Sequence, residues 1–157
     1  MTSGCGERSW LDSVTLEPMD PYDLAAVLRL ERVSFPSAWT PESYLRELRN
    51  ENAYYVVARG EGEVIGYAGM WVIAEEAHIS TLAVRPDFRR RGLGKTMLRH
   101  LMQIARARQA THMTLEVREQ NEIALALYRK LGFEPRALLP HYYGDTGENA
   151  YVMAREL

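Results

Sequence analysis

Three side chains in the second half of the chain, Glu116, Asn121 and Tyr128, have types and a spacing suited to acid–base chemistry. Glu116 alternates with apolar neighbours in a strand-like segment, where partial burial is expected to raise its pKa above ~4.3 and make it a better general base. Asn121 and Tyr128 are seven residues apart, so on a helix they share one face about 10 Å apart along the axis. Ordinary structural roles stay open on these residues alone: a Glu116–Arg118 pair, an N-cap at Asn121 and a half-buried aromatic at Tyr128.

A segment rich in arginine and glycine, Val84 to Lys95, has the composition of a phosphate-binding loop. It reads V-R-P-D-F-R-R-R-G-L-G-K and joins a strand-like run to a helix-like run. Backbone N–H groups at a helix start, with the positive end of the helix dipole, favour a phosphate. The spacing of a P-loop is missing, and Met97 stands where the dinucleotide fingerprint requires a third glycine. The pattern therefore favours a phosphate ligand other than ATP or NAD.

The charge of the chain is unevenly distributed. The formal net charge is only −2 over 157 residues, yet Arg85 to Arg108 holds eight Lys or Arg against Asp87 alone, a local charge of +7. A basic patch on an otherwise acidic protein suits a small polyanion or, less well, a stretch of nucleic acid. The hydrophobic content of 46% suits one compact domain of this length.

A sheet with flanking helices is expected to position these residues. Apolar alternation predicts seven strands and helical periodicity predicts four helices. The strands are expected at 14–17, 54–59, 64–73, 77–84, 113–118, 133–139 and 149–154, and the helices at 21–34, 41–50, 92–108 and 121–131. This order predicts an α/β or α+β domain with a sheet of mixed strand direction.

The spacing R-x-x-G-x-G, from Arg89 to Gly92 and Gly94 after a strand ending V-x-P, resembles the coenzyme A signature of the GNAT acetyltransferases. The order of elements is similar to that family over nearly the whole chain. The resemblance implies a single GNAT-like domain at 13–157 behind a flexible leader at 1–12, with a mixed central sheet of about seven strands flanked by four helices. It also implies acetyl-CoA as cosubstrate, bound by Leu82, Ala83, Val84, Arg89, Arg90, Arg91, Gly92, Leu93, Gly94, Lys95 and Asn121.

A longer string, L-E-V-R-E-Q-N-E-I-A-L-A-L-Y-R-K-L-G-F from Leu115 to Phe133, resembles the RimI-type N-acetyltransferases. These bacterial enzymes act on the N-terminal alanine of a ribosomal protein. The resemblance implies that Glu116 is the general base, that Tyr128 is the general acid and that the acceptor is a protein N-terminus. It implies substrate contacts for Phe35, Trp39, His78, Tyr142 and Tyr143, and His78 competes with Glu116 for the role of base.

Other interpretations stay open beside this one. A GNAT framework would also serve a lysine side chain or a small-molecule amine, and the basic segment would also suit a module that binds RNA or the ribosome. No metal is expected, because His100 and His112 lack partners at ligand spacing and Cys5 is the only cysteine. The leader lacks an apolar core and no run approaches ~20 apolar residues, so a cytoplasmic protein without membrane contact is expected.

Overall fold

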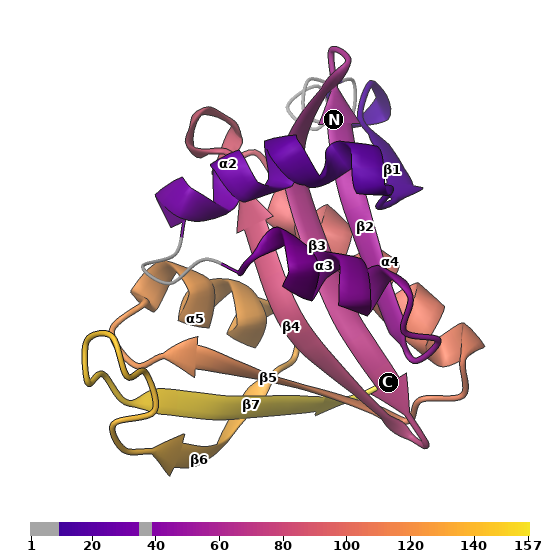
Figure 1. Ribbon diagram of the computed structural model, residues 1–157. Coiled ribbons are helices and arrows are strands. Elements are labelled where there is room, and N and C mark those ends of the chain that lie inside the picture. Colours follow the sequence, from indigo (N-terminus) through magenta and orange to yellow (C-terminus); the bar gives the residue numbers. More distant parts are fainter. Residues whose placement is uncertain (1–9, 35–38) are drawn as a thin grey trace, which may run out of the picture.

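A seven-stranded mixed sheet runs through the whole molecule (Figure 1), in the order β1-β2-β3-β4-β5-β7-β6. The structure is a computed structural model and describes residues 10–34 and 39–157. The strands are β1 Thr15–Pro18, β2 Ala53–Gly60, β3 Glu63–Ile73, β4 Glu76–Val84, β5 His112–Arg118, β6 Glu134–Leu139 and β7 Ala150–Glu156. The seven strands expected from the sequence are confirmed, each displaced by three residues or fewer at its ends.

Four α-helices and two 3-10 turns connect the strands. The helices are α2 Leu24–Ser34, α3 Pro41–Leu48, α4 Leu93–Ala107 and α5 Glu122–Lys130, and the turns are η1 Pro21–Asp23 and η2 Pro86–Phe88. Their starts follow from the sequence: Asp20 and Asp23 form a capping box, and the side chain of Thr40 caps α3 ahead of Pro41. The expected α+β architecture is confirmed: the four expected helices are present, and the described residues add a helical turn at 10–12.

The two faces of the sheet are covered by different helices. α2 and α3 lie in front of β2 to β4, and α4 lies behind them (Figure 1). Residues such as Leu98, Leu101 and Met113 form the core on the α4 side, and Val27 and Tyr67 belong to the smaller core beneath α2 and α3. The sheet is therefore packed on both faces over β2 to β4.

A bulge in β4 changes which of its residues face each side. Gly69 pairs with Thr81 and Met70 with Ile79, so Ser80 is an extra residue in β4. Before it, Ile79 packs in the α4-side core, and after it Ala83 joins the core beneath α2 and α3.

β4 and β5 separate soon after they pair. Their parallel pairing covers Glu76–His78 against His112–Thr114 and stops there. Beyond that point the strands diverge visibly (Figure 1), while β5 stays paired with β7 along its length. The β5 side of β4 from Ile79 onward therefore has backbone groups without a strand partner among the described residues.

The first residues of the described chain pack against the phosphate-loop segment. Residues 10–12, which the sequence assigned to the leader, form a helical turn, and Trp10 stacks on Phe88 with 5.8 Å between ring centroids. Across residues 10–34 and 39–157, no helix is long and apolar enough to cross a membrane.

Candidate active site

A cavity of about 330 Å³ occupies the opening between β4 and β5. Its lining residues come from β4, β5, α5 and α2, with Trp39 and, from the β6–β7 loop, Tyr143. Its lining includes Glu116 and Tyr128, the expected base and acid, together with Trp39, Asn121 and Tyr143. The divergence of two parallel strands thus brings together residues that are far apart in the sequence.

Glu116 points from β5 into this cavity and is held by two donors. Its Oε1 accepts a hydrogen bond from the Tyr142 hydroxyl at 3.1 Å and lies 3.2 Å from His78 Nε2. The side chain is 21% exposed, so solvent reaches it through the cavity. Arg118, its suggested ion-pair partner, turns instead to the β6–β7 loop.

The pKa of Glu116 is lowered, which corrects the expected sign. Burial acts to raise it, as the sequence suggested, but the hydrogen bond and charge of His78 and the hydrogen bond from Tyr142 together outweigh burial. Glu116 is therefore a carboxylate at neutral pH. It is ready to accept a proton, and its strength as a base is modest.

His78 and Glu116 were alternative candidates for the general base on sequence grounds. In the structure their side chains contact each other. His78 lies on the stretch of β4 that still pairs with β5, and its Nδ1 lies 2.7 Å from Thr114 Oγ1. The Trp71 ring of β3 stacks on the imidazole at 5.1 Å between centroids. These contacts fix the ring with Nε2 directed at Glu116.

Tyr128 lines the opposite side of the cavity from α5. Burial, with a smaller contribution from Tyr143, raises the pKa of Tyr128 to about 12. The phenol therefore keeps its proton at neutral pH and acts as a hydrogen-bond donor toward the cavity. Its ring packs edge-on against Phe133, which fixes its direction.

Asn121 performs the ordinary role that the sequence left open. Its Oδ1 accepts from the Ala124 N–H at 3.1 Å and so caps α5. The residue also borders the cavity. The side-chain amide group is the part of Asn121 that can contact a ligand while the cap is kept.

The expected phosphate loop lies at the start of α4. Gly92 occupies the N-cap with φ 88°, and no side chain of the described residues caps this helix. A φ in this range suits glycine and strains other residues. Gly94 lies close to α5, where an added Cβ would be 3.5 Å from Leu127. Backbone N–H groups of this kind, at a helix start without a side-chain cap, are able to hydrogen-bond an anion.

The basic side chains of this loop have different surroundings. Arg89 Nε donates to the Val84 carbonyl at 2.8 Å, while Arg91 stacks on the rings of Trp10 and Phe88. Arg90 has a positive φ of 62°. Leu93 is buried in the core, so only its backbone can face a ligand, and Lys95 lies in the first turn of α4.

Of the three β4 residues expected to bind the cofactor, Leu82 alone is among the residues that line the cavity. The Ala83 side chain is buried beneath α2 and α3, and Val84 leads into the loop. Because β4 has left β5 here, backbone groups are what this edge offers to a ligand.

Aromatic residues border the cavity near Glu116. Trp39 lines the cavity and packs against Tyr44, and Tyr143 lies beneath the Arg118 guanidinium at 3.9 Å. Tyr142 is 47% exposed beside Glu116. Phe35 lies outside the described residues.

Glu31 is a cavity residue that the sequence analysis missed. This buried carboxylate of α2 accepts from the Tyr67 hydroxyl at 2.9 Å and also from the Tyr44 hydroxyl and the Trp39 N–H. It thereby fixes the chain next to Trp39. Its signal was available, since Glu31 falls four residues after Val27 on the apolar stripe of the helix.

Arg118, also missed, holds the β6–β7 loop. It donates to Asp145 at 3.1 Å, to Thr146 at 3.0 Å and to Glu148 at 3.1 Å. Each of these acceptors belongs to the same short loop, so one guanidinium fixes the segment that carries Tyr142 and Tyr143.

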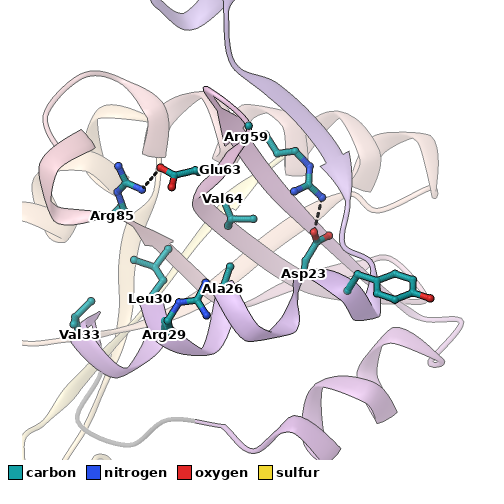
Figure 2. A pocket seen from close by; sticks show the side chains of 11 residues that line it. Asp23, Ala26, Arg29, Leu30, Val33, Arg59, Glu63, Val64 and Arg85 are labelled. Atoms are coloured by element: carbon teal, nitrogen blue, oxygen red, sulfur yellow. Dashed lines mark hydrogen bonds and ion pairs between the residues drawn. The ribbon is translucent and has the colours of Figure 1, made fainter.

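A second hollow, between α2 and the β2–β3 end of the sheet, lies away from these residues. Figure 2 shows two ion pairs among its charged side chains, Arg59 with Asp23 and Arg85 with Glu63, and Arg29 lies beside them. None of the residues expected to act in catalysis or to bind acetyl-CoA lines it. Within the two described ranges, no group of three His, Cys, Asp or Glu side chains could hold a metal ion.

Comparison with known proteins places this geometry in a family. The model of the acetyltransferase (GNAT) family matches residues 24–133. The N-alpha-acetyltransferase RimI of Mycobacterium tuberculosis is 35% identical over 151 residues, covering 92% of this chain and 94% of that protein.

Two solved structures support the same placement. The ribosomal-protein-S18-alanine N-acetyltransferase of Escherichia coli superposes with a TM-score of 0.83 at 30% identity, covering 91% of this chain and 93% of that one. Ard1 from Thermoplasma volcanium superposes with a TM-score of 0.85 at 31% identity, covering 92% and 98%.

Proposed function

This chain belongs to the acetyltransferase (GNAT) family and is an acyltransferase, and from that premise we propose that it acetylates the N-terminal α-amino group of a protein. The proposed acceptor is a ribosomal protein that begins with alanine, by analogy with the E. coli enzyme. The observation that carries the proposal is that Glu116 and Tyr128 line one cavity from different elements. With acetyl-CoA as donor, the reaction belongs in the cytoplasm.

The pantetheine arm of acetyl-CoA is expected to lie in the cavity, with its pyrophosphate at the start of α4. The N–H groups at the start of α4, which lack a capping side chain within the described chain, would hold the phosphates together with Arg90 and Lys95. The free edge of β4 near Leu82 would bind the amides of the arm as a strand does. The Asn121 amide borders the same path.

The chemistry is a direct attack of the amine on the thioester carbonyl. Glu116 accepts the proton that the ammonium loses before the attack, and the Tyr128 hydroxyl donates its proton to the sulfur as the C–S bond breaks. The second proton, which the nitrogen loses as the amide forms, restores the Tyr128 hydroxyl. Backbone N–H groups of the β4 edge stabilise the oxyanion. Bound acetyl-CoA supplies the activated acetyl group. Because the amine attacks directly, no enzyme nucleophile is needed.

The acceptor end favours an N-terminal amine. An α-amino group has a pKa of ~7.7–8.0, against ~10.4 for the lysine side chain. The α-ammonium is therefore the stronger acid, and a carboxylate with a lowered pKa such as Glu116 removes its proton more easily than that of a lysine. The Trp39 and Tyr143 rings flank the route to Glu116 and offer flat apolar surfaces to a peptide backbone.

A panel of acceptors tests the proposal. Purified protein with acetyl-CoA is expected to acetylate peptides that begin with Ala faster than spermidine, an aminoglycoside or Nα-blocked lysine. Faster transfer to any of these small amines would move the function to the alternative acceptor class.

A further inference from the structure

The first described residues of the chain, Trp10 and Leu11, pack on the loop that precedes α4. The Trp10 ring stacks on that of Phe88, with 5.8 Å between the centroids and 22° between the ring planes. A Cβ added to Gly92, the N-cap of α4, would lie 3.7 Å from Leu11 Cδ1. Two consecutive side chains ahead of the sheet therefore contact the segment where the phosphates of acetyl-CoA are proposed to bind.

The turn that carries these side chains is held by its own hydrogen bonds and by the core. The Ser13 N–H donates to the Trp10 carbonyl at 3.1 Å, and the Val14 N–H donates to the Leu11 carbonyl at 3.0 Å. Strand β1 follows directly. Trp10 and Phe88 both pack against the core on the α4 side of the sheet. The position of the Trp10 ring is therefore set by the folded domain.

Arg91 lies against both rings. Its guanidinium carbon is 5.6 Å from the ring centroid of Trp10 and 5.2 Å from that of Phe88. A cation within about 6 Å of an aromatic centroid is attracted by the negative face of the ring. The Arg91 side chain is exposed to solvent, so these two contacts are what fixes its direction.

Anchoring by aromatic rings leaves the charge of Arg91 unneutralised. The carboxylate closest to it in sequence, Asp87, is occupied by Arg85, which donates to both of its oxygens, at 2.8 Å and 3.0 Å. Among the described residues, no carboxylate forms an ion pair with Arg91. A ring face also holds a guanidinium without using up its N–H donors. The planar group therefore keeps the donors that match the oxygens of a phosphate.

The neighbouring arginines are engaged differently. Arg89 Nε donates to the Val84 carbonyl at 2.8 Å, and Arg85 pairs with carboxylates. Arg91 directly precedes Gly92, so its side chain starts next to the backbone N–H groups at the beginning of α4. A fixed cation at this place adds charge-assisted hydrogen bonds to those that the helix start offers an anion.

We propose that Trp10 is a positioning residue for the donor substrate: with Phe88 it holds Arg91 beside the start of α4, where the guanidinium binds a phosphate group of acetyl-CoA. The inference rests on acetyl-CoA as the donor of the proposed function. Trp10 precedes residues 24–133, which match the acetyltransferase (GNAT) family model. The Trp10 contact is therefore added by a segment outside the part of the chain that the family model matches.

The expected gain in affinity comes from pre-organisation. Immobilising a long side chain when a ligand binds lowers the affinity, because the rotamer freedom of that side chain is lost. In this protein the two rings already restrict Arg91 before the ligand arrives. Removing the Trp10 ring should therefore raise the Kd of CoA by roughly threefold to tenfold.

Calorimetric titration of the full chain with CoA tests the proposal. Trp10→Leu keeps an apolar side chain against Phe88 and removes the aromatic face, and it should raise Kd by this factor. Arg91→Ala removes the cation and should raise Kd by at least as much. Trp10→Phe, which keeps a ring, should stay within about twofold of the wild type. Arg106→Ala is the matched control, because it removes a cation about 20 Å along α4 from the loop, and its Kd should not change.

A double variant shows whether the ring acts through the arginine. Trp10→Leu combined with Arg91→Ala should bind CoA no more weakly than Arg91→Ala alone. The same variants titrated with 3′-dephospho-CoA locate the phosphate: an equal effect assigns the pyrophosphate, and a lost effect assigns the 3′-phosphate. Pantetheine, which carries no phosphate, should bind the wild type and Trp10→Leu equally in an NMR titration.

Three results would overturn the inference: an unchanged Kd of CoA in Trp10→Leu, effects of the two substitutions that multiply in the double variant, or weaker binding of pantetheine to Trp10→Leu. Should Trp10→Leu not fold, an unchanged Kd of CoA in Arg91→Ala overturns the inference by itself. If the variants differ in CoA binding as expected and the wild type acetylates no peptide, the proposed function fails and the role of Trp10 stands.

Discussion

The Tyr142 hydroxyl donates to Glu116 Oε1 over 3.1 Å, so the β6–β7 loop is fastened directly to the candidate base. Arg118, two residues after Glu116 on the same strand, holds the other side of this loop through Asp145 and Glu148. The side of the cavity proposed to take the acceptor is therefore built by β5 together with a loop that follows it by more than twenty residues.

Arg118→Ala is expected to free this loop and weaken peptide binding. The substitution removes the guanidinium, and with it the contacts to Asp145, Thr146 and Glu148 and the stacking on Tyr143. We expect KM for the peptide to rise on the order of tenfold, equivalent to ~1.4 kcal/mol, with the Kd of acetyl-CoA unchanged. Arg136→Ala, in the exposed strand β6, is the matched control. Equal peptide KM in both variants would contradict the role of Arg118.

Glu116→Gln should lower kcat by ~10²–10⁴-fold, the contribution of a positioned general base. The amide keeps the size of the side chain but cannot accept the ammonium proton. Binding of acetyl-CoA, measured by calorimetry, should be unaffected. Glu134→Gln controls for loss of a carboxylate, because Glu134 is 73% exposed on β6. A kcat within threefold of wild type would exclude Glu116 as the base.

Tyr128→Phe should lower turnover while the peptide still binds. The substitution removes only the hydroxyl, and the ring keeps its edge-on contact with Phe133. We expect a fall in kcat of roughly 100-fold with little change in peptide KM. Tyr22→Phe, at a side chain that is 96% exposed, is the control. Unchanged turnover would remove Tyr128 as the acid.

The pH dependence of kcat/KM near neutral pH should follow the titration of the acceptor amine, and the titration of Glu116 should not appear in this range. Because His78 and Tyr142 outweigh burial and hold the pKa of Glu116 below its usual range, its base form dominates at every pH above ~4.3. Activity should therefore fall as the pH drops through ~7.7–8.0, where the α-amine gains its proton. An acidic limb that keeps its position when the amine pKa of the peptide is changed would contradict this assignment.

Gly69→Ala should destabilise the fold. An added Cβ at Gly69 would lie 2.1 Å from the ring of Tyr55, which is buried beneath α3. Overpacking of this kind costs ~1–3 kcal/mol, and we expect Tm to fall by several degrees. Gly144→Ala is the control, since no heavy atom of the described residues lies within 4 Å of the added Cβ. Equal Tm values would contradict the tight packing at Gly69.

Most of the fold was predictable because its signals are local. Apolar alternation gave the strands, and Asp20, Thr40 and Asn121 gave helix starts through their side-chain oxygens. Even the bulge leaves a trace in the sequence. The core positions of β4 change from Ala77 and Ile79 to Leu82 and Val84, which is a break in the apolar alternation.

The parts that escaped prediction depend on contacts distant in sequence. The net pKa shift of Glu116 required His78 from another strand and Tyr142 from a loop. The separation of β4 from β5, which forms the cavity, arises from sheet geometry. The predicted ligand contacts of Arg89 to Lys95 remain predictions, and Arg91 already stacks on Trp10.

The central claim, transfer to a protein N-terminus, is tested most directly by locating the acetyl group on one peptide. A peptide that begins with Ala and contains an internal Lys is incubated with the protein and acetyl-CoA, then fragmented by mass spectrometry. We predict acetylation at the α-amine alone, and none when that amine is blocked beforehand. Acetylation of the lysine, with or without the block, would contradict the account.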